Sequence, residues 1–108
     1  MQSSVMSVFE LVVGPQSSEV CVCLEGELDL ATVPRVGQAV RELREVGWES
    51  IVVDLAGVEF VDSSGLRLLV ELDGRARAEG WRLALRGECP AFERLLCVTG
   101  LRDWFGRA

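Results

Sequence analysis

The residues of this sequence best suited to chemistry are two serines, Ser63 and Ser64, in the run Asp62-Ser63-Ser64-Gly65. The β-branched residues 51–53 before this run are typical of a buried strand, and apolar residues continue after it over the length of a helix. Aspartate and serine at such a junction cap helices, and the N-terminus of a helix favours added negative charge. The sequence therefore predicts a strand-to-helix turn at which a hydroxyl can receive a phosphate.

The residues that would make either serine a nucleophile are missing. The chain contains no histidine, which excludes a Ser-His-Asp triad, a phosphohistidine relay and His-ligated metal sites. The Gly-x-Ser-x-Gly nucleophile elbow is absent, and so are the Gly-rich phosphate-binding loops of P-loop and dinucleotide-binding proteins. We therefore predict that the protein is not an enzyme, with no catalytic residue and no cofactor.

Four cysteines raise the question of a metal or redox site. Cys21 and Cys23 lie two apart in a segment that is typical of a strand, so both should point to the same face, while Cys89 and Cys97 are far along the chain. This is not a standard zinc spacing, and free cysteine is among the most buried residue types. We expect Cys21 and Cys23 to face the core and to bind no metal, with a metal or redox role as the open alternative.

Size and charge indicate one acidic globular domain over residues 1–108, with its core at about residues 8–105. The chain has 108 residues, 49% hydrophobic and 26% charged, and a net charge of −6 at pH 7. Nucleic-acid binding needs a concentrated basic surface, so we expect no nucleic-acid partner. No apolar run approaches the length of about 20 residues that crosses a bilayer, and the N-terminus lacks the features of a signal peptide. A cytoplasmic monomer that does not insert into membranes is expected.

Strand and helix patterns alternate along the chain. Strands are expected over residues 8–13, 19–25, 50–55 and 81–86, with a last short one over 101–105; helices are expected to begin near Thr32, Ser63 and Pro90 and to end at Gly47, Gly80 and Gly100. This order predicts an α/β fold with a mixed sheet of four or five strands and three or more helices packed mainly on one side. Sites in such sheets gather at the carboxyl ends of the strands, which is where Ser63 falls, with the turn at residues 26–29 beside it.

Three motifs in this order give the chain a family resemblance from about residue 8 to about residue 105. They are Gly26-Glu-Leu-Asp29 at a strand end, Asp54-Leu followed by Val58-x-Phe60-Val-Asp62-Ser63-Ser64-Gly65-Leu66, and Phe92-x-x-Leu95 with Thr99-Gly100-Leu101. With these motifs the chain resembles the STAS domain and, within that family, the bacterial anti-sigma-factor antagonists.

The resemblance implies a small switch protein that binds an anti-sigma factor, itself a serine kinase, and so frees a sigma factor for transcription. The serine that this family modifies is the first of the pair after the aspartate, which corresponds to Ser63. Asp62, Ser64 and Gly65 flank the phosphorylation site, and Asp29 lies in the neighbouring loop of the partner surface. The resemblance further implies that phosphorylation turns the binding off and that a separate serine phosphatase resets Ser63.

Other interpretations of the same residues remain. Ser63 and Ser64 could serve only as helix caps, and Asp62 only as a cap or turn residue. STAS domains also occur as interaction or scaffold subunits of larger assemblies, in which Ser63 would never be modified. A third possibility is weak nucleotide binding at the strand ends, although no lysine or Gly-rich cradle accompanies the serines.

Overall fold

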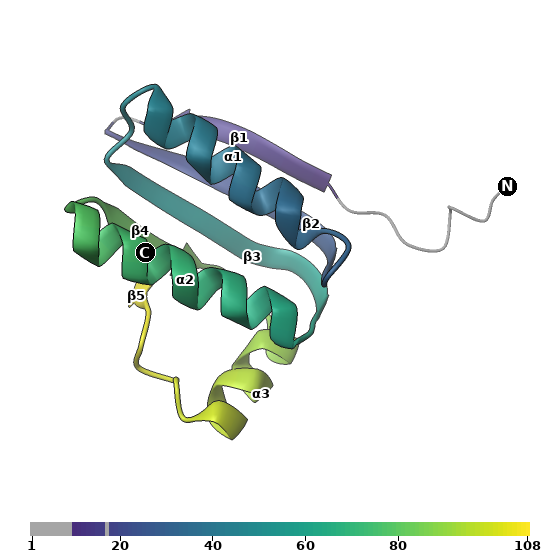
Figure 1. Cartoon of the computed structure of the whole chain (residues 1–108). Helices are drawn as coiled ribbons and strands as arrows, with labels where there is room; N and C mark the ends of the chain where they lie inside the picture. Colours follow the sequence, from purple (N-terminus) through teal and green to yellow (C-terminus); the bar gives the residue numbers. More distant parts are fainter. Residues whose placement is uncertain (1–9, 17) are drawn as a thin grey trace, which may run out of the picture.

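The computed structural model describes residues 10–16 and 18–108 (Figure 1). The elements follow the order β1 (Glu10–Gln16), β2 (Glu19–Leu28), α1 (Val33–Glu45), β3 (Ser50–Val61), α2 (Ser63–Glu79), β4 (Arg82–Arg86), α3 (Pro90–Thr99) and β5 (Gly106–Arg107). The five strands form one sheet in the order β1-β2-β3-β4-β5, in which β1 is antiparallel to β2 and all other pairs are parallel. The predicted mixed sheet with three helices is confirmed.

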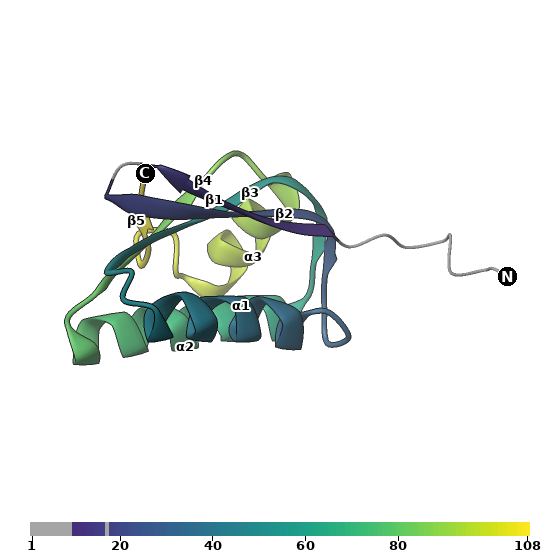
Figure 2. The same cartoon turned by 90° about the horizontal axis from the view of Figure 1, so that it is seen from above.

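The helices α1 and α2 lie side by side over one face of the sheet (Figure 2). Alternate residues of the central strands point to these helices and are buried, among them Val20, Val22, Leu24, Ile51, Val53, Leu55, Leu83 and Leu85. The helix α3 joins the same core through Phe92 and Leu96, which are both fully buried. A single core therefore holds the sheet and all three helices.

The first hairpin is longer and tighter than the sequence predicted. We expected β1 to end at residue 13, but the strand continues through Gly14 and Pro15, and Gln16 pairs with Glu19. Proline is tolerated there because β1 is an edge strand, whose outward N–H groups have no partner in the sheet. Val8 and Phe9 of the predicted strand lie outside the described residues.

The strands β2 and β3 both continue to the candidate site. From Cys23 to Glu25 the strand β2 advances by two residues while β3 advances by three, and β3 has a second extra residue between Val58 and Phe60, so β3 is the bulged strand. Gly26 on β2, beside the second bulge, has a positive φ of 106°. The predicted strand near residues 50–55 in fact runs from Ser50 to Val61. The prediction relied on the β-branched residues 51–53. The bulges break the alternation of the residues that follow, so the second half of β3 was taken for a loop.

The start of α1 and the position of the last strand differ from expectation. Thr32 is at the N-cap position of α1, as predicted, but its hydroxyl makes no cap hydrogen bond. The last strand is Gly106–Arg107 and not residues 101–105, because the chain turns over Leu101–Trp104 and inserts Phe105 into the core against Phe92, with ring centroids 5.8 Å apart. The predicted ends of the helices at Gly80 and Gly100 are confirmed, since both are left-handed C-caps.

Candidate functional site

Ser63 is the first residue of α2, and its side chain is exposed. Asp62 is the N-cap, and its Oδ1 accepts hydrogen bonds from the backbone N–H groups of Ser64 at 2.8 Å and Gly65 at 3.2 Å. The main-chain carbonyl of Asp62 accepts from the N–H groups of Gly65 and Leu66 at 3.1 and 3.2 Å. Asp62 is thus the cap, Ser64 takes part through its backbone N–H, and Ser63 is left outside this network.

This cap bears on where a phosphate would lie. The sequence suggested that the helix N-terminus would stabilise negative charge on Ser63, but the carboxylate of Asp62 already occupies the N–H groups of the first turn. A phosphate on Ser63 would lie beside that carboxylate, and like charges repel. It would therefore project toward solvent and a partner rather than fold into the helix end.

The loop that carries Asp29 is built by its own hydrogen bonds. The Oδ1 atom of Asp29 accepts from the N–H groups of Ala31 at 3.0 Å and Thr32 at 3.2 Å, which closes an Asx turn. The Thr32 hydroxyl accepts from the Asp29 N–H at 3.0 Å and donates to the Glu27 carbonyl at 2.7 Å. Thr32 therefore holds the loop to the end of β2 instead of capping α1.

The two loops meet as predicted, because β2 and β3 are paired up to Leu28 and Val61. The Asp62 N–H donates to the Leu28 carbonyl at 3.2 Å, which joins the start of α2 to the end of β2. Gly65 permits this approach, since a Cβ there would lie 2.9 Å from the Leu28 carbonyl oxygen, from Leu28 Cγ and from Val61 Cγ1. Asp29 and Ser63 therefore lie in adjacent loops at the carboxyl ends of neighbouring parallel strands.

Exposed apolar side chains accompany these loops, and the sequence analysis did not single them out as an apolar surface. Leu30, directly after Asp29, is 73% exposed, Phe60 near the end of β3 is 47% exposed, and Val98 on α3 is 84% exposed. Phe60 and Val98 line a shallow hollow of about 360 Å³ together with Val61, Ala91, Arg94 and Leu95. Sequence reasoning missed this surface because β3 is bulged just before Phe60. Simple alternation of buried and exposed residues therefore does not show that Phe60 points outward.

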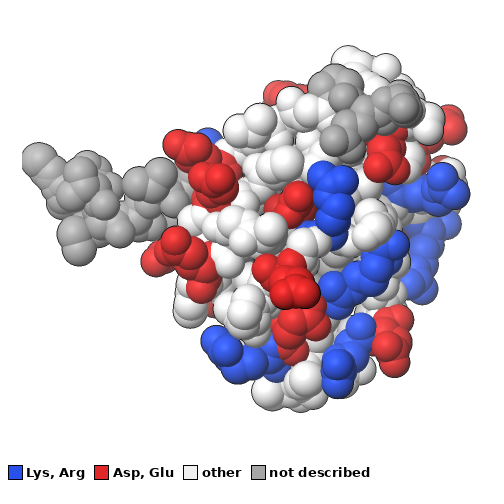
Figure 3. Space-filling view, turned by 180° about the vertical axis from the view of Figure 1, so that it is seen from behind, with Lys and Arg blue, Asp and Glu red and all other residues white. Residues whose placement is uncertain are grey.

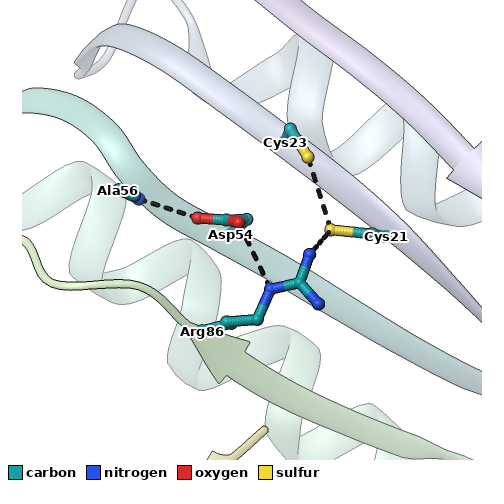
Figure 4. A network of polar contacts seen from close by, with 5 residues as sticks. All are labelled: Cys21, Cys23, Asp54, Ala56 and Arg86. Atoms are coloured by element: carbon teal, nitrogen blue, oxygen red, sulfur yellow. Dashed lines mark hydrogen bonds and ion pairs between the residues drawn. The ribbon is translucent and has the colours of Figure 1, made fainter.

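A second polar cluster lies on the face of the sheet that the helices leave open (Figure 4). Cys21 and Cys23 do share a face, but the prediction that they point toward the helices is wrong, because Val20, Val22 and Leu24 take those positions. The predicted burial is confirmed for Cys21, which is 2% exposed, but not for Cys23, which is partly exposed. The two sulfur atoms are 3.4 Å apart, and the Arg86 guanidinium donates to Cys21 Sγ at 2.8 Å and to Asp54 Oδ2 at 3.2 Å. Arg86 and Asp54 had no predicted role here.

The Cys21 thiol is not set up as a nucleophile. Burial, the contact with Cys23 and the charge of Asp54 raise its pKa to about 11, against the opposing effect of Arg86. At neutral pH it is therefore a protonated thiol and a weak nucleophile.

The face of the sheet that the helices leave open carries basic and acidic side chains interspersed, as the view from behind shows (Figure 3). Over the described residues, no helix is long and apolar enough to cross a membrane.

Comparison with known proteins agrees with this fold. A sequence model of the family described as "Mlab, STAS domain" matches residues 12–105. An anti-sigma-B factor antagonist of Staphylococcus epidermidis is 35% identical over 78 residues, which are 72% of this chain and 72% of that protein. A crystal structure of an anti-sigma factor antagonist from Mycobacterium paratuberculosis superposes with a TM-score of 0.79 at 28% identity, covering 91% of this chain and 83% of that one.

The anti-sigma factor antagonist SpoIIAA, solved in an unphosphorylated form and, from Bacillus, in a phosphorylated form, has the same fold. Its TM-scores to this chain are 0.73 and 0.69, at 24% identity, with 94% of this chain covered in both cases and 88% and 91% of the respective SpoIIAA chains. The family match over most of the length, together with the close sequence relatives, shows that this chain belongs to the STAS domain family.

Proposed function

We propose that this chain is an anti-sigma factor antagonist that binds an anti-sigma factor at the start of α2, and that this partner, a serine kinase, ends the binding by phosphorylating Ser63. The observation that carries the proposal is the position of Ser63, which is exposed and lies outside the cap that Asp62 forms. A kinase can reach such a hydroxyl without opening the helix. The names of the relatives at 35% and 28% identity support the antagonist role.

The apolar side chains around the two loops would form the centre of the partner surface. Large exposed apolar residues that lie close together mark interaction sites, and aromatic residues carry much of the binding energy at such sites. Leu30 follows Asp29, Phe60 comes just before the Ser63 turn, and Val98 shares the hollow with Phe60. We expect the anti-sigma factor to cover these three residues and Ser63 together.

The size of the switch follows from the charge that it adds. Phosphorylation adds a charge of about −1.5 to −2. At a distance of roughly 6 Å and an effective dielectric constant of 20 to 80, each pair of unit charges costs about 0.7 to 2.8 kcal/mol. Repulsion from one partner carboxylate then weakens binding by roughly 3-fold to 100-fold for each unit of added charge. One phosphate is therefore enough to release the partner without a change of fold.

The phosphorylation site is tested by the mass of the protein recovered from its native cells, with peptide mapping. We expect wild type and Ser64→Ala to carry one phosphate group on the peptide that contains residue 63, and Ser63→Ala to carry none. Phosphate on Ser64, or its absence from all three proteins under several growth conditions, would contradict the switch. The latter result would favour an unswitched interaction module.

The binding step is tested separately with Ser63→Asp, which mimics part of the added charge. We expect this variant to keep the circular dichroism spectrum and melting temperature of wild type but to bind the anti-sigma factor more weakly, while Ser64→Ala binds normally. If Ser63→Asp loses its fold together with binding, the effect is not local to the interface.

We further propose that the protein acts in the cytoplasm, as a monomer without catalytic activity, and that a serine phosphatase removes the phosphate.

A further inference from the structure

We propose that Cys21, Cys23 and Asp54 form a binding site for a thiophilic divalent cation such as Zn²⁺ on the open face of the sheet, and that Arg86 occupies this site when no metal is bound. The site lies on the face of the sheet that the helices leave open (Figure 4). Its residues belong to the strands β2, β3 and β4, whereas Ser63 begins α2. The ligand atoms of the three residues all lie within 4.8 Å of one another.

The geometry of the two sulfurs is close to what a tetrahedral ion needs. Two thiolates bound at about 2.3 Å around a tetrahedral Zn²⁺ are about 3.8 Å apart, so the observed separation of 3.4 Å has to open by only about 0.4 Å. Cys21 and Cys23 stand two apart on β2, and the neighbouring strand β3 supplies Asp54 in register with Cys23. Regular strand pairing therefore brings a Cys-x-Cys pair and a carboxylate to one point.

The carboxylate is already oriented for this role. The Ala56 N–H donates to Asp54 Oδ1 at 2.9 Å, which leaves Oδ2 on the side of Arg86. Such hydrogen bonds to a ligand from outside the site fix its orientation in metal centres. Gly87, with φ of 90°, allows the end of β4 to come this close, since a Cβ there would be 2.6 Å from Asp54 Oδ1.

Arg86 shows that the cluster already attracts a cation. Its guanidinium contacts Cys21 Sγ at 2.8 Å and Asp54 Oδ2 at 3.2 Å, and its side chain is 34% exposed, so it can swing out to solvent. Its departure would free Oδ2 and leave a fourth position open to water, as in zinc sites with three protein ligands.

Binding is balanced in protons and charge. Each thiol releases its proton to water as its sulfur binds the ion, because a coordinated thiol is deprotonated. The two thiolates and the carboxylate then carry one more negative charge than the divalent cation neutralises. The guanidinium of Arg86 moves out to solvent, and mobile counter-ions balance that charge.

The test is a titration of the reduced, chelator-treated full chain with Co²⁺, which reports thiolate ligands by a charge-transfer band in the near ultraviolet, followed by displacement with Zn²⁺. We expect one equivalent per chain for wild type and for the control Cys97→Ser, which removes an exposed free thiol. Cys21→Ser combined with Cys23→Ser should lose the band and weaken Zn²⁺ binding on the order of 100-fold or more. A band that persists in this double variant would overturn the site.

Arg86→Gln provides an independent test that does not depend on the stability of the cysteine variants. Removing the resident cation should tighten Zn²⁺ binding on the order of tenfold, since it removes both the competitor and a like charge. Unchanged or weaker binding by Arg86→Gln, or no thiolate band in wild type, would overturn the proposal. Circular dichroism of each variant shows that the fold is kept, and Cys23→Ser alone serves if the double variant does not fold.

Discussion

Gly65→Ala offers a direct test of how the start of α2 is positioned. A Cβ at residue 65 would lie 2.9 Å from the carbonyl oxygen and Cγ of Leu28 and from Cγ1 of Val61, and Gly65 is buried. The carbonyl belongs to the end of β2 and cannot rotate away as a side chain can. The substitution should therefore push α2 and Ser63 away from the Asp29 loop.

The magnitude follows from two opposing effects. Alanine in place of glycine in a helix gains about 1 kcal/mol from propensity, while inserting a methyl into a filled contact costs about 1–3 kcal/mol. Contacts of 2.9 Å to three heavy atoms, one of them backbone, place the cost at the upper end. We expect a net loss of about 1–2 kcal/mol, which lowers the Tm of a chain of 108 residues by roughly 4–9 °C.

The same helix contains its own control. Gly74 is exposed, and a Cβ there would meet nothing within 4 Å, so Gly74→Ala should gain helix propensity alone. Its expected gain is about 0.5–1 kcal/mol, or roughly 2–4 °C in Tm. Both variants can be compared with wild type by thermal and urea unfolding followed by circular dichroism. If Gly65→Ala proves as stable as Gly74→Ala, the close approach of α2 to β2 does not constrain this site.

Substitutions at two further positions, Asp62 and Thr32, test the two loops that meet at this site. Asp62→Ala removes the acceptor for the first-turn N–H groups of α2 and should cost about 1 kcal/mol in urea unfolding, with a smaller loss for Asp62→Ser; equal losses would show that the side chain is not the cap. Thr32→Val removes the hydrogen bonds to Glu27 and Asp29 at nearly constant volume and should cost about 1–2 kcal/mol. Thr32→Ser keeps the hydroxyl, so its free energy of unfolding should remain near that of wild type. A loss of stability as large as that of Thr32→Val would show that the methyl group of Thr32 matters instead of its hydroxyl.

Much of this fold could be predicted from local sequence signals. Capping residues and glycines marked the helix ends: Asp62 starts α2, Pro90 starts α3, and Gly80 and Gly100 end their helices with left-handed backbone. Strand-helix-strand order then predicted the parallel pairing, which brings the loops of Asp29 and Ser63 together. Helix ends and strand order depend on residues that are close together in the sequence, so both could be predicted without the structure.

The failures share a different physical cause. The bulges of β3 move its alternation of buried and exposed residues out of step, which hid the second half of β3 and the outward direction of Phe60. The contact of Arg86 with Cys21 joins residues 65 positions apart, and no local pattern indicates it. Which face of the sheet the helices cover also decides whether Cys21 points inward, and periodicity does not say which face that is.

The cap at Asp62 determines what kind of switch a phosphate on Ser63 would be. The dipole of α2 would favour the added charge by about 0.3–1 kcal/mol, while a neighbouring carboxylate opposes it by about 0.7 kcal/mol or more for each pair of unit charges. Because these effects have opposite signs and similar sizes, the fold gains little and loses little on phosphorylation. The Asp62 carboxylate also holds the N–H groups that could draw the phosphate inward. Under the proposed function, the free energy of the switch therefore arises where the phosphate meets the partner.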